Sequence, residues 1–324
     1  MPEPVRAFIS FIVPALNEER NIGRSIDSIE GCLKPGGKLT AVSDYEIIVV
    51  DNGSTDRTRE ICLAKGARFL SHPGLTVGAL RNTGAEAAKG EVLVFIDADV
   101  SLTPGWSSRL PALIRFLEEK PLTVTGSRVK SDDSASYSIR QWFSIGKGAA
   151  QANYINSGHM IIRKDVFTSL GGFNQALVSG EDSELCQRAA HSGISITPLD
   201  GLDAIHNEAP ASLFEFFKRE RWHGYGDYQS FSNFRKSRPA MMAALNVLAI
   251  LSLSTIFLIY MEPSALIVYF FILTGLSALS GLHRNKFRID RKFPVFIYMY
   301  MVYITARSLS LFDFLLGLSP GRWR

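Results

Sequence analysis

The chain up to about residue 238 alternates between short apolar runs and segments with a helical pattern. Four runs have the length and composition of buried strands: residues 8–13, 46–50, 91–96 and 122–129. Four segments have the pattern of helices: residues 21–33, 56–65, 77–89 and 105–119. Ser54 or Thr55 is the expected cap of the second helix. This alternation predicts an α/β domain with a mostly parallel central sheet and helices on both faces.

The pattern changes after Pro239, where long stretches without charge begin. Residues 241–260 and 264–282 are each long enough to cross a bilayer as a helix, and only three residues separate them. Basic residues precede the first stretch and crowd residues 283–293, whereas the short turn between the stretches has none. Positively charged loops stay on the cytosolic side, so we expect this hairpin to begin and end there.

Three further segments each leave two interpretations open. Residues 294–318 are apolar but contain Arg307 and Asp313, so they either span the membrane with these charges facing protein or lie along its surface. We therefore expect two or three membrane helices. Residues 211–234 interleave aromatic and basic side chains, which suits a helix on the headgroup layer or one packed on the soluble domain. Residues 131–151 are either a mobile loop or a passive linker.

Composition narrows the classes of protein to consider. The net charge of +4 is carried by basic residues near the hydrophobic stretches, where they meet anionic lipid headgroups, so we expect no nucleic-acid partner. The three cysteines are far apart and form no CxxC, which argues against a disulfide framework or a structural zinc site. The first residues lack the apolar run of a signal peptide. We expect the N-terminal domain on the cytosolic face of an inner or plasma membrane.

Polar residues follow three of the predicted strands, at the ends where parallel sheets bind their ligands. The segment Pro14-Ala15-Leu16-Asn17-Glu18 follows the first strand, and Asp51 follows the second. Asp97 and Asp99 come directly after residues 91–96. In an extended chain these two carboxylates point the same way. Such a pair can hold a hard divalent cation, which in turn bridges phosphate oxygens.

Five motifs carry a resemblance to a known family. They are "IVPALNEE" (12–19), "IIVVDNGSTDRT" (47–58), "GALRNTGAEAAKGEVLVFIDADV" (78–100), "NSGHMIIRKDVFTSLGGF" (156–173) and "GEDSEL" (180–185). Together and in this order they resemble the family 2 glycosyltransferases of the GT-A fold, over roughly residues 8–230. We accordingly expect a GT-A catalytic domain over residues 1–210, an amphipathic interface segment over 211–238 and a membrane domain over 239–324.

The resemblance implies roles for single residues. The donor nucleotide would contact Pro14, Ala15, Asn17, Glu18, Asp51, Arg81 and Asp97, with Asp51 on the base (usually uracil) and Arg81 near the ribose or diphosphate. Asp99 would ligate Mg²⁺ or Mn²⁺, and Gly158 would lie close to the donor sugar. Asp182 would be the catalytic base. Its neighbour Glu181 either raises the pKa of Asp182 through like charge or is simply a negative charge at a helix N-terminus.

Two later features resemble the family less specifically. His206 would complete the metal shell, or it is a structural histidine. The segment Lys218-Arg219-Glu220-Arg221-Trp222 resembles the (Q/R)xxRW motif of polysaccharide synthases, with lysine in place of the usual first residue. Arg221 and Trp222 would then contact the acceptor or a phosphate. Otherwise they belong to the aromatic and basic helix over residues 211–234.

The implied reaction is an inverting transfer of a sugar from a nucleotide-diphosphate donor, with a UDP-sugar as the expected donor, to a hydroxyl or phosphate of a lipid-linked or membrane-proximal acceptor. The metal and Arg81 would stabilise the leaving diphosphate, and one base would activate the acceptor. A sugar-nucleotide nucleotidyltransferase is an alternative, although its usual Gly-rich loop is absent. A non-catalytic membrane scaffold is a second alternative. The sequence contains neither a Rossmann GxGxxG nor a complete Walker A loop, which removes the main support for dehydrogenases and kinases.

Overall fold

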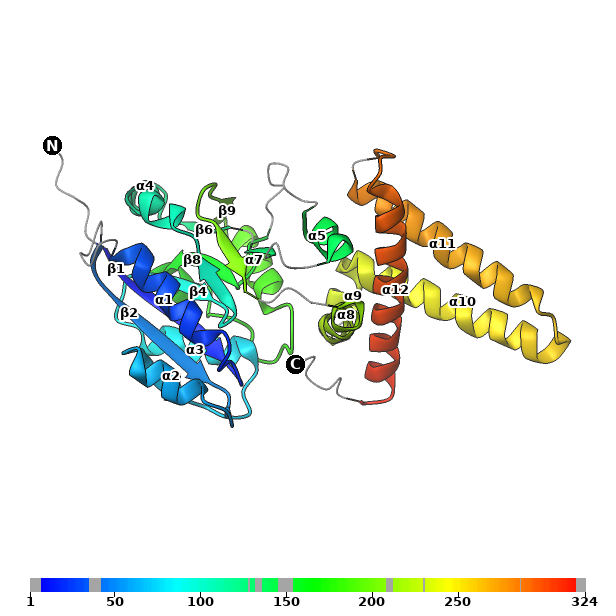
Figure 1. Cartoon of the computed structure of the whole chain (residues 1–324), viewed down its shortest axis with the longest axis horizontal. Helices are drawn as coiled ribbons and strands as arrows, with labels where there is room; N and C mark the ends of the chain where they lie inside the picture. The colour runs from blue at the N-terminus through cyan, green and yellow to red at the C-terminus, as the bar shows by residue number, and fades with distance from the viewer. Residues whose placement is uncertain are drawn as a thin grey trace. The chain divides into compact units, whose positions relative to one another are not determined.

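A computed structural model of the protein describes residues 7–34, 42–127, 129–131, 136–144, 154–207, 212–229, 231–285 and 287–318 (Figure 1). The chain divides into two compact units. The N-terminal unit combines residues 1–132 with 149–208, and the C-terminal unit combines residues 133–148 with 209–324. The division near residue 208 lies close to the expected boundary at 210. The short piece 133–148, expected in the catalytic domain, groups with the C-terminal unit instead.

A seven-stranded sheet forms the centre of the N-terminal unit, with the order β3-β2-β1-β4-β8-β6-β9. Its strands are β1 (Ala7–Ala15), β2 (Val42–Asp51), β3 (Arg68–Ser71), β4 (Val92–Ile96), β6 (Thr123–Gly126), β8 (His159–Arg163) and β9 (Ser195–Pro198). All neighbours pair in parallel except β8, which runs antiparallel to both β4 and β6. The predicted mostly parallel sheet is confirmed, and the reversed strand is an addition to it.

A second, three-stranded sheet has the order β5-β10-β7. Its strands are β5 (Val100–Leu102), β7 (Val129–Ser131) and β10 (Ala204–His206). The β10 strand pairs antiparallel with β5 and places His206 opposite Val100, one residue after Asp99. This small sheet brings residues from two distant parts of the sequence to the same place.

Helices cover both faces of the large sheet in the N-terminal unit. They are α1 (Ile22–Leu33), α2 (Thr58–Ala64), α3 (Val77–Ala87), α4 (Gly105–Glu119), α6 (Lys164–Ser169) and α7 (Glu181–His191). Side chains of β4 alternate between two cores: Val94 and Ile96 pack in one, and Leu93 and Phe95 pack in the other. Because both faces are buried, the strand has a continuous apolar run in the sequence.

The start of α2 differs from the prediction. We expected a helix from Asp56 with Ser54 or Thr55 as its cap, but the helix begins at Thr58. The Ser54 hydroxyl is used elsewhere, since it donates to Asp51 and accepts from the amide of Asn17. The tertiary contacts of these loop residues therefore replace the local cap that the sequence pattern favours.

The C-terminal unit is helical in its described residues. Its helices are α5 (Tyr137–Ser144), α8 (Leu213–Tyr228), α9 (Phe231–Lys236), α10 (Arg238–Tyr260), α11 (Ser264–Arg284) and α12 (Phe293–Leu315). Among the described residues, α10, α11 and α12 are long and apolar enough to cross a membrane. The expected hairpin of α10 and α11 is present (Figure 1). Residues 131–151, expected to be a loop, contain α5, and the rest of that segment lies largely outside the described residues.

Candidate active site

The loops after β1 and β2 are held together by side chain to backbone hydrogen bonds. The Asn17 amide donates to Ser54 Oγ at 2.8 Å, and Asn17 Oδ1 accepts from the Thr55 amide at 2.9 Å. The Glu18 amide donates to Thr58 Oγ1 at 2.8 Å. Asn17 has a φ of +54°, in the left-handed region that asparagine tolerates better than most residues. The two loops therefore form one rigid rim at the carboxyl ends of these strands.

Asp51 lies at the end of β2 and is buried. Its Oδ2 accepts from the amides of Gly53 and Ser54, both at 2.9 Å, and its Oδ1 accepts from the Ser54 hydroxyl. The carboxylate thus fixes the turn that follows β2. Contact with a nucleotide base stays a prediction for this residue.

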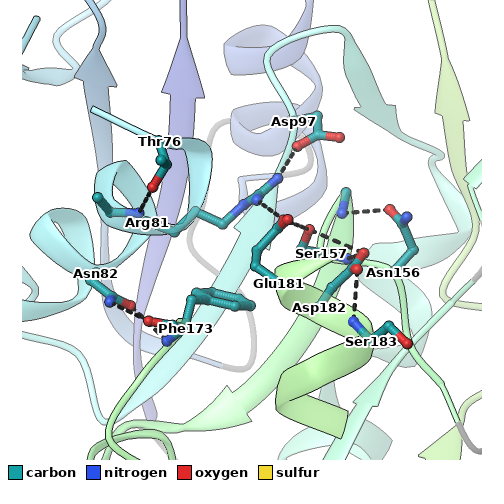
Figure 2. Close-up of polar contacts among 12 residues, drawn as sticks. Thr76, Arg81, Asn82, Asp97, Asn156, Ser157, Phe173, Glu181, Asp182 and Ser183 are labelled. Carbon is teal, nitrogen blue, oxygen red and sulfur yellow. Dashed lines mark hydrogen bonds and ion pairs between the residues drawn. The ribbon is translucent and has the colours of Figure 1, made fainter. Parts of the chain in front are cut away.

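Arg81 on α3 links two carboxylates from distant segments (Figure 2). Its Nη2 lies 2.6 Å from Asp97 Oδ1, and its Nη1 lies 2.7 Å from Glu181 Oε1. The side chain is only 3% exposed, so the guanidinium is almost fully removed from water. A buried guanidinium keeps its charge and needs such partners. Arg81 therefore connects β4 to the start of α7.

Asp97 and Asp99 do not form the extended pair that the sequence predicts. The Val100 amide donates to the Asp97 carbonyl at 3.0 Å, which closes a turn after β4. Asp97 consequently reaches Arg81, whereas Asp99 lies beside His206, with 3.3 Å between Asp99 Oδ2 and His206 Nδ1. The pairing of β10 with β5 brings this histidine to Asp99.

His206 Nδ1 is buried and has no hydrogen-bond partner among the described residues. An orphaned buried nitrogen next to a carboxylate fits a cation ligand, because imidazole and carboxylate both bind divalent metals. No group of three acidic, histidine or cysteine side chains with the geometry of a metal cage occurs among the described residues. Two protein ligands suit Mg²⁺, which commonly takes its remaining ligands from water and substrate phosphates.

Glu181 and Asp182 begin α7, directly after Gly180, whose φ of +81° turns the chain into the helix. Both carboxylates are buried. Burial and the neighbouring Asp182 charge together raise the pKa of Glu181 to about 7, although Arg81 acts in the opposite direction. The adjacent residues face different partners, since Glu181 reaches Arg81 while Asp182 reaches the chain before β8 (Figure 2).

Three residues before β8, which we had not predicted as site residues, surround these carboxylates. The Tyr154 hydroxyl donates to Asp182 Oδ2 at 2.7 Å, and the Ser157 amide donates to the same oxygen at 3.2 Å. The Ser157 hydroxyl also reaches Glu181 Oε1 at 3.2 Å, and Asn156 Nδ2 donates to the Tyr154 hydroxyl. These residues precede a strand, so a search of the residues that follow strands misses them. They reach the carboxyl edge of the sheet because β8 runs antiparallel to β4, and the first residue of β8 pairs with the last residue of β4.

Gly158 lies where a side chain has no room. A Cβ built there would be 2.7 Å from Asn156 Oδ1 and 2.8 Å from Asp97 Oδ2. A side chain at this position would displace the ends of the Asn156 and Asp97 side chains, so glycine allows the backbone to approach the polar cluster closely. The structure brings together Arg81, Asp97, Gly158, Glu181 and Asp182. Proximity to the donor sugar stays a prediction.

Arg221 and Trp222 belong to the C-terminal unit, on α8. Arg221 Nε and Nη2 each donate to Asp313 of α12 at 2.6 Å, in a bidentate ion pair. Trp222 is half-buried and packs against the His223 ring. The ion pair gives Arg221 a structural partner, and acceptor contact stays a prediction for both residues.

Comparisons with known proteins agree with this geometry. The sequence model of Glycosyl transferase family 2 matches residues 10–169. Glycosyltransferase AglE of Haloferax volcanii is 27% identical over 234 residues, which cover 68% of this chain and 73% of that protein. Dolichyl-phosphate beta-glucosyltransferase ALG5A of Trichomonas vaginalis is 27% identical over 152 residues, 44% of this chain and 47% of that protein.

A solved structure shares the fold. The mannosyltransferase PcManGT from Pyrobaculum calidifontis, in complex with GDP-Man and Mn²⁺, matches with a TM-score of 0.58 at 17% identity. The match covers 98% of this chain and 90% of that one. The mostly parallel sheet agrees with this likeness. Residues 10–169 therefore match the family 2 glycosyltransferases, and the chain combines a domain of the GT-A fold with apolar helices long enough to cross a membrane.

Proposed function

We propose that the protein transfers a sugar, with inversion, from a nucleoside diphosphate sugar to an acceptor carried by a membrane lipid. The observation that supports this most is the cluster of Asp97 with the buried side chains of Arg81, Glu181 and Asp182, beside Gly158. It places a fixed positive charge next to a pair of carboxylates at the carboxyl edge of the sheet. The positive charge can stabilise a charged leaving group, and a carboxylate can activate the acceptor as a base.

Asp99 and His206 are the residues that would hold a divalent metal. Their facing atoms lie 3.3 Å apart, and the histidine nitrogen is buried without a hydrogen-bond partner among the described residues. When bound, Mg²⁺ or Mn²⁺ would neutralise charge on the leaving diphosphate. Arg81 would contribute a second positive charge on the side of Asp97. The rim of Pro14, Ala15, Asn17, Glu18 and Asp51 would line the nucleotide pocket.

Asp182 is the proposed base. Tyr154 and Ser157 hold its Oδ2, and the Ser183 amide donates to its Oδ1 at 2.7 Å. These donors fix the orientation of the carboxylate. One base and one displacement at the anomeric carbon invert its configuration. Glu181 is engaged with Arg81 and is proposed to position it.

The proposed acceptor is a lipid that carries a hydroxyl or a phosphate. Three apolar helices associate the chain with a membrane, and the ALG5A relative is named for transfer to dolichyl phosphate. The proposed donor nucleotide is uridine or guanosine diphosphate, since the resemblance favours uracil and the PcManGT structure holds GDP-Man. Arg221 and Trp222 are retained as proposed acceptor contacts. The basic residues around the hairpin favour a cytosolic catalytic domain at an inner or plasma membrane.

A donor and acceptor screen tests the proposal directly. Full-length protein in detergent is supplied with Mn²⁺ or Mg²⁺, a panel of UDP- and GDP-sugars, and polyprenyl phosphate or membrane lipid extract. We expect release of the nucleoside diphosphate together with a labelled lipid product of inverted configuration. Asp182→Asn should abolish transfer while the nucleotide still binds, whereas Asp27→Asn, on an exposed surface, should change neither. Pyrophosphorolysis of the sugar nucleotides without transfer would indicate the nucleotidyltransferase alternative.

A further inference from the structure

The burial of α10 shows where α12 touches it. The buried residues of α10 are Ala240, Ala243, Asn246 and Val247, all in its first ten positions, although the structure describes the whole helix. The buried residues of α12 extend from Phe296 to Asp313, along nearly its full length. A helix that ran beside α10 through a bilayer would bury both along their lengths. The contact is therefore a crossing, and it lies at the base of the hairpin.

Individual contacts between α12 and the hairpin show the same crossing. Asn246 Nδ2 donates to Ser308 Oγ at 2.9 Å. Asn246 is about 12 Å along α10 from its start, whereas Ser308 is about 22 Å along α12 from its start, at 1.5 Å per residue. Gly281, near the end of α11, faces Phe296 near the start of α12. Figure 1 shows α12 running across the base of the α10–α11 hairpin instead of alongside it.

The charges of α12 all face α8. Arg307 lies 3.0 Å from Glu220 and 2.9 Å from Asp227, and Asp313 pairs with Arg221. Gly224 allows this close packing, because a Cβ there would be 2.7 Å from Ser310 Oγ. The ion pairs are enclosed between two helices, so α12 exposes none of these charges on its free side.

An apolar stripe occupies the free side of α12. Tyr298, Leu309 and Leu316 are exposed. Tyr298 and Leu309 are eleven residues apart, which places them on one face of the helix at 100° per residue, and Leu316 follows directly after the last residue of the helix. The neighbouring hairpin is also apolar and exposed, with Leu248, Leu251 and Leu258 among its free side chains. The free side of α12 and the hairpin are therefore both apolar.

The short helix α5 packs against α8 and α12. Trp142 packs against Phe216 of α8 and against Tyr300 and Tyr303 of α12, with ring centroids 5.3, 4.8 and 5.3 Å apart. Arg284 at the end of α11 donates to the Trp142 carbonyl at 2.6 Å. We use the name platform for α5, α8 and α12 together.

We infer that the platform lies in the membrane interface and that only α10 and α11 cross the bilayer. The α12 helix runs parallel to the membrane plane, with its apolar stripe against lipid and its charges against α8. Interfacial helices have this division between an apolar and a polar face. Leu318 then lies on the side of the membrane where α10 begins, and not on the side of the α10–α11 turn.

Cysteine labelling of full-length protein in sealed membranes tests the topology. The native Cys32, Cys62 and Cys186 are buried, so wild type serves as the unlabelled control. Phe287→Cys and Leu318→Cys bracket α12 at exposed positions, and Glu262→Cys marks the hairpin turn. With a membrane-impermeant maleimide, residues 287 and 318 should label from the same side, and residue 262 from the opposite side.

Two outcomes would overturn the inference. If residue 318 labels together with residue 262 and opposite to residue 287, α12 spans the bilayer. If all three label from one side, the hairpin does not cross. Lipid contact is tested separately with a nitroxide spin label attached to Leu309→Cys. The label should collide more often with oxygen, which is enriched in lipid, than with a water-soluble nickel chelate. A label on Leu251→Cys, in the hairpin, should show the same preference. Leu63→Cys, at an exposed position in the N-terminal unit, is the reference for a label in water. Collision rates on Leu309→Cys equal to those on Leu63→Cys would exclude contact of the stripe with lipid.

Discussion

Tyr154 and Ser157 hold the same oxygen of Asp182, and the hydrogen bond from Tyr154 is the shorter one. A hydrogen bond to a charged group contributes about 1.5–3 kcal/mol. Tyr154→Phe should therefore lower kcat roughly ten- to hundredfold, because Asp182 loses the shorter of the two hydrogen bonds that orient it.

Nucleotide affinity should not change in Tyr154→Phe, because the hydroxyl positions the base and not the donor. Tyr45→Phe is the matched control, since the Tyr45 hydroxyl reaches Glu30 and lies outside the cluster. An unchanged kcat in Tyr154→Phe would show that the hydroxyl has no role in positioning Asp182.

His206 offers a direct test of the proposed metal site. His206→Ala removes one of two facing ligand atoms, so the affinity for Mn²⁺ should fall at least about tenfold. Binding is measured by the electron paramagnetic resonance signal of free Mn²⁺, with nucleoside diphosphate present and without turnover. His191→Ala, at the exposed end of α7, is the control. Equal Mn²⁺ affinity in both variants would remove His206 from the metal site.

At the scale of elements, His159 joins β8 to α4 and to the chain after β6. Its Nε2 accepts from Trp106 Nε1 at 3.1 Å, and its Nδ1 lies 2.9 Å from Ser127 Oγ. Burial lowers the pKa of His159 to about 4. The imidazole is therefore neutral in the folded protein at any ordinary pH, and charging it would disrupt the core.

This burial makes the stability of the N-terminal unit dependent on pH. Below pH 6.5 the unfolded chain takes up a proton at His159, and the folded chain does not until about pH 4. The stability is therefore complete above pH 6.5 and falls as pH decreases, by up to about 3 kcal/mol. Thermal unfolding between pH 7 and 4 should show this loss, and His159→Gln should flatten that part of the profile. An equal slope in wild type and variant would contradict the assignment.

The Arg221–Asp313 pair joins α8 to α12 and predicts a charge-swap result. Arg221→Asp or Asp313→Arg alone places like charges together, which should lower the apparent melting temperature by a few degrees. The double variant should recover most of this loss, because the opposite charges again face each other. The apparent melting temperature of each variant is measured by fluorescence-detected size-exclusion chromatography after heating. Failure of the double variant to recover would mean that the pair does not hold the helices together.

Some elements were predictable because a local pattern determines them. Residues 105–119 were predicted as a helix and form α4 with these bounds, since its apolar spacing and packing agree. The turn after β4 was not predictable, because the bond of Asp97 to Arg81 depends on how α3 packs beside β4 and not on the local pattern around Asp97. Tyr154 and Ser157 escaped detection for a similar reason, since their role depends on the reversed direction of β8.

At the scale of the whole molecule, the membrane helices predict a preference for acceptors in a lipid phase. Confining enzyme and acceptor to one surface raises their effective concentration. In vesicles, kcat/KM for a long-chain lipid phosphate should exceed that for a short, water-soluble analogue with the same headgroup. The two values are compared at equal bulk concentration, and both should converge when excess detergent disperses the acceptor. A soluble analogue that reacts equally well in vesicles would contradict a lipid acceptor.

The crossing of α12 also has a consequence for the membranes in which the protein can reside. With two spanning helices of 23 and 21 residues, the hydrophobic length of the protein is about 32–34 Å. This length is set by the hairpin alone, and it is close to that of an ordinary bilayer. Changes in the length of α12 would leave the match to bilayer thickness unaffected. The thickness of the bilayer therefore constrains the lengths of α10 and α11. The length of α12 is constrained instead by the helices that pack against it.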